Sequence, residues 1–181
     1  MGIMLRFRAA LLVLGAVAPV AWAGTSPVVG TGSTTALQEP IPDDTVIVLQ
    51  RGNCEGGCPV YRVVIFADGD VIWQGRARVA RLGVVQSRIE RDQVRDLLRR
   101  FQAMDYVHLE NIYGFRGPGC SSMKPDMPTT VTSLSSGGMS RTLTHHDGCV
   151  GDVSAKLAAL EDGIDKTVNT ARWIAAPPKR R

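Results

Sequence analysis

The spacing of hydrophobic residues divides the chain into predicted strands and two later predicted helices. Residues 46–49 are continuously apolar and mostly β-branched, which is typical of a buried strand. Two further β-prone runs, residues 60–67 and 70–75, flank the dipeptide Asp68-Gly69. Because a tight turn needs a positive φ that glycine adopts freely, this dipeptide predicts a hairpin.

A two-residue turn at Asp68-Gly69 predicts which side chains share each face of this hairpin. One face then carries Val64, Phe66, Val71 and Trp73, and the other carries Val63, Ile65 and Ile72. Apolar residues on both faces predict a central hairpin that is covered on two sides. Further hairpins are predicted from residues 76–82 and 84–89 around Gly83, and from residues 129–134 and 139–144 around residues 135–138.

Two segments show the three- and four-residue spacing of amphipathic helices. The apolar stripes are Val94, Leu97, Leu98, Phe101 and Met104 within residues 91–104, and Val153, Leu157, Leu160, Ile164 and Val168 after Gly151. Asp152 is placed to cap the second helix, and Trp173 to close the core. This order predicts an α+β domain over residues 45–173, with an antiparallel β-sheet built from hairpins and two α-helices packed on it.

The first 23 residues have the pattern of a secretory signal peptide. Two arginines and no acid precede an apolar run at residues 9–20, and Ala21-Trp22-Ala23 is a small-x-small cleavage site. The run is shorter than the roughly 20 residues that a membrane span needs. We therefore expect residues 1–23 to be cleaved, no transmembrane segment after cleavage, a flexible linker at residues 24–44, and a disordered basic tail at residues 174–181.

Composition and charge narrow the class of protein. The 181 residues are 44% hydrophobic and 21% charged, which excludes a wholly disordered chain and a polytopic membrane protein. The formal charge of +4 falls to +2 on cleavage, because Arg6 and Arg8 are removed. So small an excess does not indicate a nucleic-acid partner. We expect a periplasmic or secreted protein that binds an envelope component or another protein, and no nucleic acid.

The four cysteines, at positions 54, 58, 120 and 149, all follow the cleavage site. Disulfides are the default in an oxidising compartment, and four cysteines allow three pairings. We favour Cys54 with Cys58, because Gly56-Gly57 lets the short loop turn back, and Cys120 with Cys149, because both lie in the C-terminal half. Cys120 would then fix the irregular stretch at residues 106–128, and a loop of that length is more often functional or pinned than idle.

Few residues have a spacing that indicates catalysis or metal binding. A catalytic thiol pair normally has two residues between its cysteines, whereas Cys54 and Cys58 have three between them. His145 and His146 are a weaker alternative as metal ligands, since neighbouring residues of a strand point to opposite faces. No Gly-x-Ser-x-Gly nucleophile motif occurs. We expect no metal and no cofactor.

Four arginines form the densest basic cluster of the sequence: Arg76, Arg78, Arg81 and Arg88. Edge strands often carry charge that prevents pairing with another sheet, and we favour this interpretation. The alternative is a contact with an anionic envelope polymer or a lipid headgroup.

The segment Arg51-Gly52-x-Cys54-x-x-Gly57-Cys58-Pro59-Val60-Tyr61, followed by a strand, Asp68-Gly69, another strand and Gly75, resembles the bacterial family of unknown function DUF6438. The resemblance spans about residues 45–173. It implies a small exported domain without an assigned activity. Cys120 and Cys149 are additions to the family pattern, which supports their pairing with each other.

The motif residues also have physical roles. We expect Arg51 to pair with a carboxylate such as Asp126, and the Tyr61 hydroxyl to bond a loop carbonyl, so that the cysteine loop forms a rigid knuckle on the sheet edge. The alternative is that Arg51, Tyr61 and Asp126 line a ligand cleft beside the disulfide.

Two functions fit these features of the sequence. We favour a non-enzymatic, disulfide-stabilised module that binds a partner or associates with the envelope. The alternative is a small periplasmic hydrolase, or a thiol-redox or metal-binding protein, with a site near the Cys54–Cys58 loop and residues 106–128.

Overall fold

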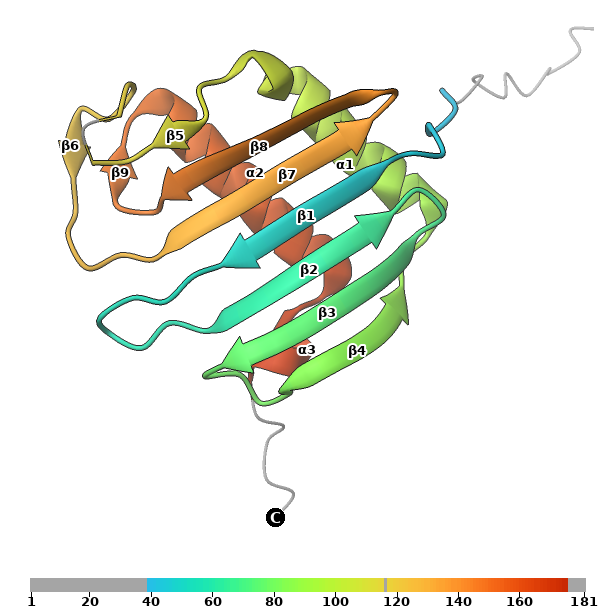
Figure 1. Cartoon of the computed structure of the whole chain (residues 1–181), viewed down its shortest axis with the longest axis horizontal. Helices are drawn as coiled ribbons and strands as arrows, with labels where there is room; N and C mark the ends of the chain where they lie inside the picture. Colours follow the sequence, from blue (N-terminus) through green and yellow to red (C-terminus); the bar gives the residue numbers. More distant parts are fainter. Residues whose placement is uncertain (1–38, 116, 176–181) are drawn as a thin grey trace, which may run out of the picture. The chain divides into compact units, whose positions relative to one another are not determined.

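Seven strands form one sheet in the order β4-β3-β2-β1-β7-β8-β5 (Figure 1). The computed structural model describes residues 39–115 and 117–175. Its strands are β1 (Val46–Arg51), β2 (Val60–Phe66), β3 (Asp70–Ala77), β4 (Gly83–Arg88), β5 (Ile112–Tyr113), β6 (Ser122–Met123), β7 (Thr129–Ser136), β8 (Met139–His146) and β9 (Cys149–Val150). Neighbours in the large sheet are antiparallel, except that β5 is parallel to β8. Strands β6 and β9 pair separately.

The helices lie on one face of this sheet (Figure 1). They are α1 (Arg91–Ala103), the 3-10 turn η1 (Tyr106–His108), α2 (Asp152–Val168) and α3 (Ala171–Ile174). The predicted α+β class, with an antiparallel sheet and two main helices, is confirmed. Helix α2 begins one residue earlier than a cap at Asp152 requires, because Gly151 takes the cap position and Asp152 is the first helical residue.

The core lies between the sheet and the helices. Strand β1 is central, and its side chains Ile47 and Leu49 are completely buried. Burying an aliphatic side chain of this size contributes about 1.5–3 kcal/mol. The Trp73 ring stacks on Tyr61 with centroids 4.5 Å apart and meets Trp173 at 5.0 Å, so Trp173 closes the core as expected.

The β2–β3 connection corrects the predicted face assignment. Residues 67–69 form a three-residue loop in which Gly69 has a φ of +92° and donates its N–H to the Phe66 carbonyl. The register pairs Val63 with Trp73, Val64 with Ile72 and Ile65 with Val71. One more loop residue than predicted therefore moves Val71 and Trp73 to the opposite side of the hairpin.

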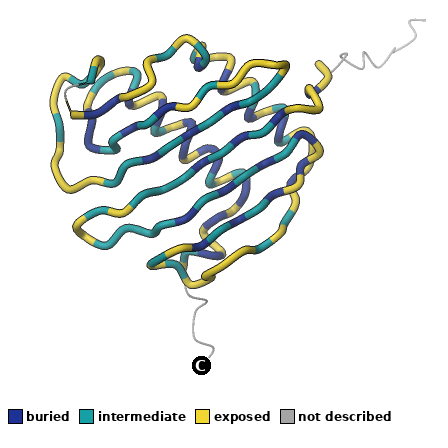
Figure 2. Tube along the Cα trace, viewed as in Figure 1, coloured by how far each residue is buried: buried dark blue, intermediate teal, exposed yellow. Residues whose placement is uncertain are grey.

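The hairpin is also covered on one side rather than two. Along β1, β2 and β3 the buried residues alternate with partly exposed ones (Figure 2). The buried set faces the helices, and within the described residues no helix lies on the other side (Figure 1). We call this other side the open face.

The β3–β4 hairpin differs from the predicted arrangement around Gly83. Strand β3 continues to Ala77, and residues 78–82 form the loop, so Arg76 belongs to the first strand of the pair. The backbone N–H groups of Ala80 and Arg81 donate to the carbonyls of Ile174 and Trp173 in α3. Gly75 permits this close approach, because a β-carbon there would lie 2.0 Å from the Arg81 carbonyl oxygen.

The β7–β8 hairpin turns at Gly137-Gly138, within the predicted turn. The Asp44 carboxylate accepts both glycine N–H groups at 2.8 and 2.7 Å, which holds its pKa below the usual value. Ile41 is buried as well, so packing extends into the segment expected to be a linker. The expected signal peptide and most of the basic tail lie outside the described residues, and no described helix is both long and apolar enough to cross a membrane.

Candidate functional site

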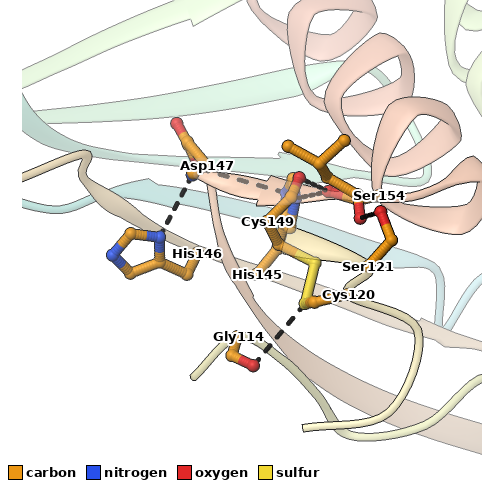
Figure 3. The surroundings of a disulfide bond; sticks show 10 residues. Gly114, Cys120, Ser121, His145, His146, Asp147, Cys149 and Ser154 are labelled. Carbon is orange, nitrogen blue, oxygen red and sulfur yellow. Dashed lines mark hydrogen bonds and ion pairs between the residues drawn. A yellow bond between two sulfur atoms is a disulfide. The ribbon is translucent and has the colours of Figure 1, made fainter. Parts of the chain in front are cut away.

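Two disulfides, Cys54–Cys58 and Cys120–Cys149, form as predicted and use all four cysteines. The first closes the loop between β1 and β2, which are interior strands, so the loop lies at the end of the sheet rather than on its edge. The second joins the irregular stretch at 106–128 to β9, just before α2 (Figure 3). The second loop therefore leads directly into α2.

A cluster of polar side chains fills the space between the sheet and α2 at this end. We call it the polar cluster, and its members are Arg51, Tyr61, Thr130, His145, Asp147, Ser154, Glu161, Asp162, Asp165 and Thr170. Of these, Glu161 has no exposed area and His145 is 1% exposed. Buried polar groups persist when each has a hydrogen-bond partner.

Ser154, His145 and Glu161 form a hydrogen-bonded chain. The Ser154 Oγ lies 2.6 Å from His145 Nε2 and donates its proton to the Cys149 carbonyl, also at 2.6 Å (Figure 3). Because the hydroxyl has one proton, His145 Nε2 must donate to it. His145 Nδ1 lies 3.1 Å from Glu161 Oε1, and that contact requires one proton shared between the ring and the carboxyl group.

The residue types of this chain match a nucleophile triad, but its geometry does not. A nucleophilic serine donates its proton to the histidine and is reachable by substrate. Here Ser154 donates to a backbone carbonyl and is 3% exposed. Neither of two sizeable cavities, of about 490 and 460 Å³, is lined by Ser154. The arrangement is that of a buried structural network.

Arg51 ties β1 to α2 with every donor that it has. Its Nε and Nη2 donate to Asp165 Oδ2 at 3.1 and 3.0 Å, and Nη2 also donates to Asp162 at 2.9 Å. Its Nη1 donates to Thr130 Oγ1 at 3.2 Å, with carboxylates of Asp147 and Glu161 at 3.5 Å. These contacts account for all five guanidinium N–H groups, so none is left for a ligand.

Tyr61 meets the same carboxylate from β2. Its hydroxyl donates to Asp165 Oδ1 at 2.8 Å, and Thr170 Oγ1 donates to that oxygen at 2.9 Å. Burial, together with the Asp165 charge, raises the pKa of Tyr61 above its usual range. Arg51 and Tyr61, which flank the cysteine loop, therefore clamp it to α2 through Asp165.

The structure brings together two of the three residues of the predicted ligand cleft. Arg51 and Tyr61 meet at Asp165, whereas Asp126 is exposed in the loop before β7, with a φ of +62°. Among the described residues no hydrogen bond or ion pair joins Asp126 to either of them. Arg51 does pair with carboxylates, as expected, but these belong to α2 and to Asp147.

Sequence reasoning missed the acids of α2, although the helix contains a clue to them. Glu161 lies four residues after Leu157 and three before Ile164, inside the apolar stripe. An acid at such a position predicts a buried partner of opposite charge. Asp165 lies one further turn along the same helix, 114 residues after Arg51.

One group of this cluster has the geometry of a metal site. Ligand atoms of His145, Asp147 and Glu161 lie within 4.8 Å of one another. Arg51 Nη1, however, lies 3.5 Å from both carboxylates, so a guanidinium already supplies the positive charge. His146 is not in this group, and its Nδ1 accepts the N–H of Gly148 at 3.1 Å.

We predict that Arg51→Met lowers the free energy of unfolding by about 3–5 kcal/mol, because it leaves buried carboxylates without a counterion. Arg99→Met is the control, since Arg99 is 61% exposed and pairs with Asp96 on the surface of α1. Its expected cost is under about 1 kcal/mol. Urea titration of both variants measures the difference, and equal small losses would contradict the clamp.

Stability should also depend on pH through Glu161, whose pKa is raised by burial. Free glutamate titrates near pH 4.3, so the folded chain holds a proton that the unfolded chain has lost. The bound proton therefore adds to the free energy of unfolding. This gain is fully present below the ordinary pKa of glutamate and is lost as the pH rises through the raised pKa of Glu161. Urea titrations from pH 5 to 8 should show wild type losing up to about 1.4 kcal/mol per pH unit relative to Glu161→Gln. Parallel curves would refute the shared proton.

Comparison with known proteins agrees with the position of the motif in this fold. Residues 45–168 match a family model described as a domain of unknown function, DUF6438. The match begins just before β1 and ends with α2, so it includes the cysteine loop, Arg51, Tyr61 and the acids of α2. No match is found among curated proteins. Because the model covers more than half of the chain, the protein belongs to the DUF6438 family.

Proposed function

We propose that this protein is an exported, non-enzymatic binding domain that associates with a component of the cell envelope. Its two disulfides fit an oxidising compartment outside the cytoplasm. They also leave no thiol among the cysteines for a redox or thiolate-metal function. Support for binding comes from the face of the sheet that the helices do not cover.

The open face is the observation that carries this proposal. Antiparallel sheets expose one face to water when that face is polar. Here partly exposed apolar residues lie side by side on three strands. Val48, Val64 and Ile72 form one row, with the pair Val46 and Phe66 beside it. Val131 of β7 adds a further apolar residue opposite Gln50. Contiguous apolar surface of this kind marks a binding site more often than isolated exposed residues do. A cavity of about 490 Å³ lies at its edge, lined partly by Phe66 and Ile72.

The polar cluster supports the non-enzymatic part of the proposal. Arg51 has no free donor, and the Ser154 proton is bound to a backbone carbonyl. A donor whose hydrogen bonds are already made inside the fold can bind a substrate only if those bonds are broken. The cluster therefore fits a structural role that holds the sheet to α2 and leaves the open face for a partner.

The alternative of a hydrolase is tested at Ser154, which has the residue types of a triad around it. We expect a fluorophosphonate probe, which labels nucleophilic serines, to leave the folded protein unlabelled. Ser121, which is exposed and lies near the same disulfide, provides the control variant. Labelling that is lost in Ser154→Ala and kept in Ser121→Ala would establish a nucleophile and contradict the proposal.

Association with the envelope is tested by co-sedimentation. The mature chain, with both disulfides intact, is mixed with the insoluble envelope fraction of the producing cell or with an equal mass of its washed cytosolic precipitate. We expect the protein to sediment with the envelope fraction and to remain in the supernatant with the other. Equal distribution in the two mixtures would overturn the proposal.

A further inference from the structure

The open face carries an arginine, Arg62, that has no partner in the described part of the chain. Strand register aligns Gln50 of β1, Arg62 of β2 and Gln74 of β3 in one row across the sheet. Their neighbours on the strand, such as Tyr61 and Val63, are buried against the helices, so this row belongs to the open face. Adjacent strands lie about 4.8 Å apart, so Gln50 and Gln74 are the cross-strand neighbours of Arg62 on this face.

Within the described residues Arg62 has neither a hydrogen bond nor an ion pair, and its Nε is buried without a partner. Arg88, at the far end of β4, pairs with Asp68 and Asp70. Asp70 is the one acid on the strands of the open face, so no strand carboxylate remains for Arg62. A buried donor without a partner is unfavourable, and a ligand that bonds to it would remove that cost.

A second cation lies beside this row. Arg76 follows Gln74 on the same face of β3, is exposed, and donates to the Gln74 carboxamide oxygen at 3.3 Å. On the other side of the row lie the apolar residues Val48, Val64 and Ile72, which the register also aligns. The row of Gln50, Arg62 and Gln74 continues to Val131 of β7 and Val84 of β4. The open face thus has a basic, amide-containing row near the cysteine loop and an aliphatic row one step closer to the β2–β3 turn.

We propose that Arg62, flanked by Gln50 and Gln74, binds a carboxylate group of an acidic polysaccharide that lies on the open face. The inference rests on the proposed binding function and names its ligand. A guanidinium bonds a carboxylate through two parallel N–H groups. The carboxamides both donate to and accept from sugar hydroxyls, and the aliphatic row contacts the C–H surface of the sugar rings.

The charges on the open face argue against other ligands. A second copy of the chain docked about a two-fold axis at this row would bring Arg62 and Arg76 against the same cations of its partner. Nucleic acids and anionic membranes are bound by several phosphate-contacting cations, whereas this row holds one unpaired guanidinium between two neutral amides. An acidic protein surface is the remaining competitor, and it is included in the test.

The experiment measures binding of the mature, disulfide-bonded chain to polygalacturonate, a linear polysaccharide with one carboxylate per sugar. Dextran, dextran sulfate and polyglutamate serve as the uncharged, sulfated and peptide probes in the same calorimetric titration. We expect polygalacturonate to bind at least about tenfold more tightly than each of the three. Equal binding of dextran sulfate overturns recognition of carboxylate, and equal or tighter binding of polyglutamate overturns the polysaccharide.

Three variants test the residue. Arg62→Gln should weaken polygalacturonate binding about tenfold or more, because two charge-assisted hydrogen bonds are lost. Arg62→Lys keeps the charge but not the paired geometry, and should also bind more weakly than wild type. Arg99→Gln makes the same charge change on the exposed surface of α1 and should leave binding unchanged. Equal affinities of Arg62→Gln and Arg99→Gln overturn the site.

Folding of the variants is checked by urea titration. Arg62→Gln removes an unpaired buried nitrogen, so its unfolding midpoint should not fall below that of wild type. Gln50→Ala gives a second, independent loss of affinity at the same row. If polygalacturonate fails to bind while envelope material still sediments the protein, this inference is wrong and the proposed function stands. If neither binds, both are wrong.

Discussion

The ion pair between Arg51 and Asp165 is the contact on which the rest of this structure depends. It joins the last residue of the central strand to α2, and Tyr61 adds the neighbouring strand through the same carboxylate. Three further acids, at positions 147, 161 and 162, surround the guanidinium, and the shared proton of Glu161 and His145 reduces their repulsion. A buried ion pair of this kind adds little net stability, yet removing one partner is costly. The pair therefore specifies how the sheet sits on the helix.

Two arginines on adjacent strands show how the two faces of the sheet differ. Arg51 faces the helices and has every N–H bonded, whereas Arg62 faces outward and has no partner among the described residues. The register pairs the motif residue Tyr61 with Arg51 and places Arg62 opposite Gln50. The sequence motif of the family thus serves the side that holds the fold together. The open face is then available to differ in its chemistry, since its side chains support no helix.

The sequence predicted the elements better than their faces or their long-range contacts. Hydrophobic periodicity located β1, β2, the β7–β8 hairpin and both main helices, because period and turn chemistry are local properties. Asp68-Gly69 fits both a two-residue turn and a three-residue loop with glycine at positive φ. The choice between them decides which face of the sheet each side chain of β3 occupies. The partner of Arg51 could not be chosen from sequence, because Asp165 is 114 residues away and Asp126 is equally acidic. The lack of a partner for Arg62 could not be predicted either, because the strand register decides which residues are its neighbours.

We infer that this chain binds through the open face, whereas its polar cluster holds the fold together. Side-chain and backbone chemical shifts of the mature protein, followed by NMR during titration with polygalacturonate, test it most directly. We expect changes at Arg62, Gln50 and Gln74, with Arg51, His145 and Ser154 unchanged. Shifts concentrated at Arg51 and His145, with Arg62 unchanged, would contradict it, because they would place the ligand in the polar cluster instead.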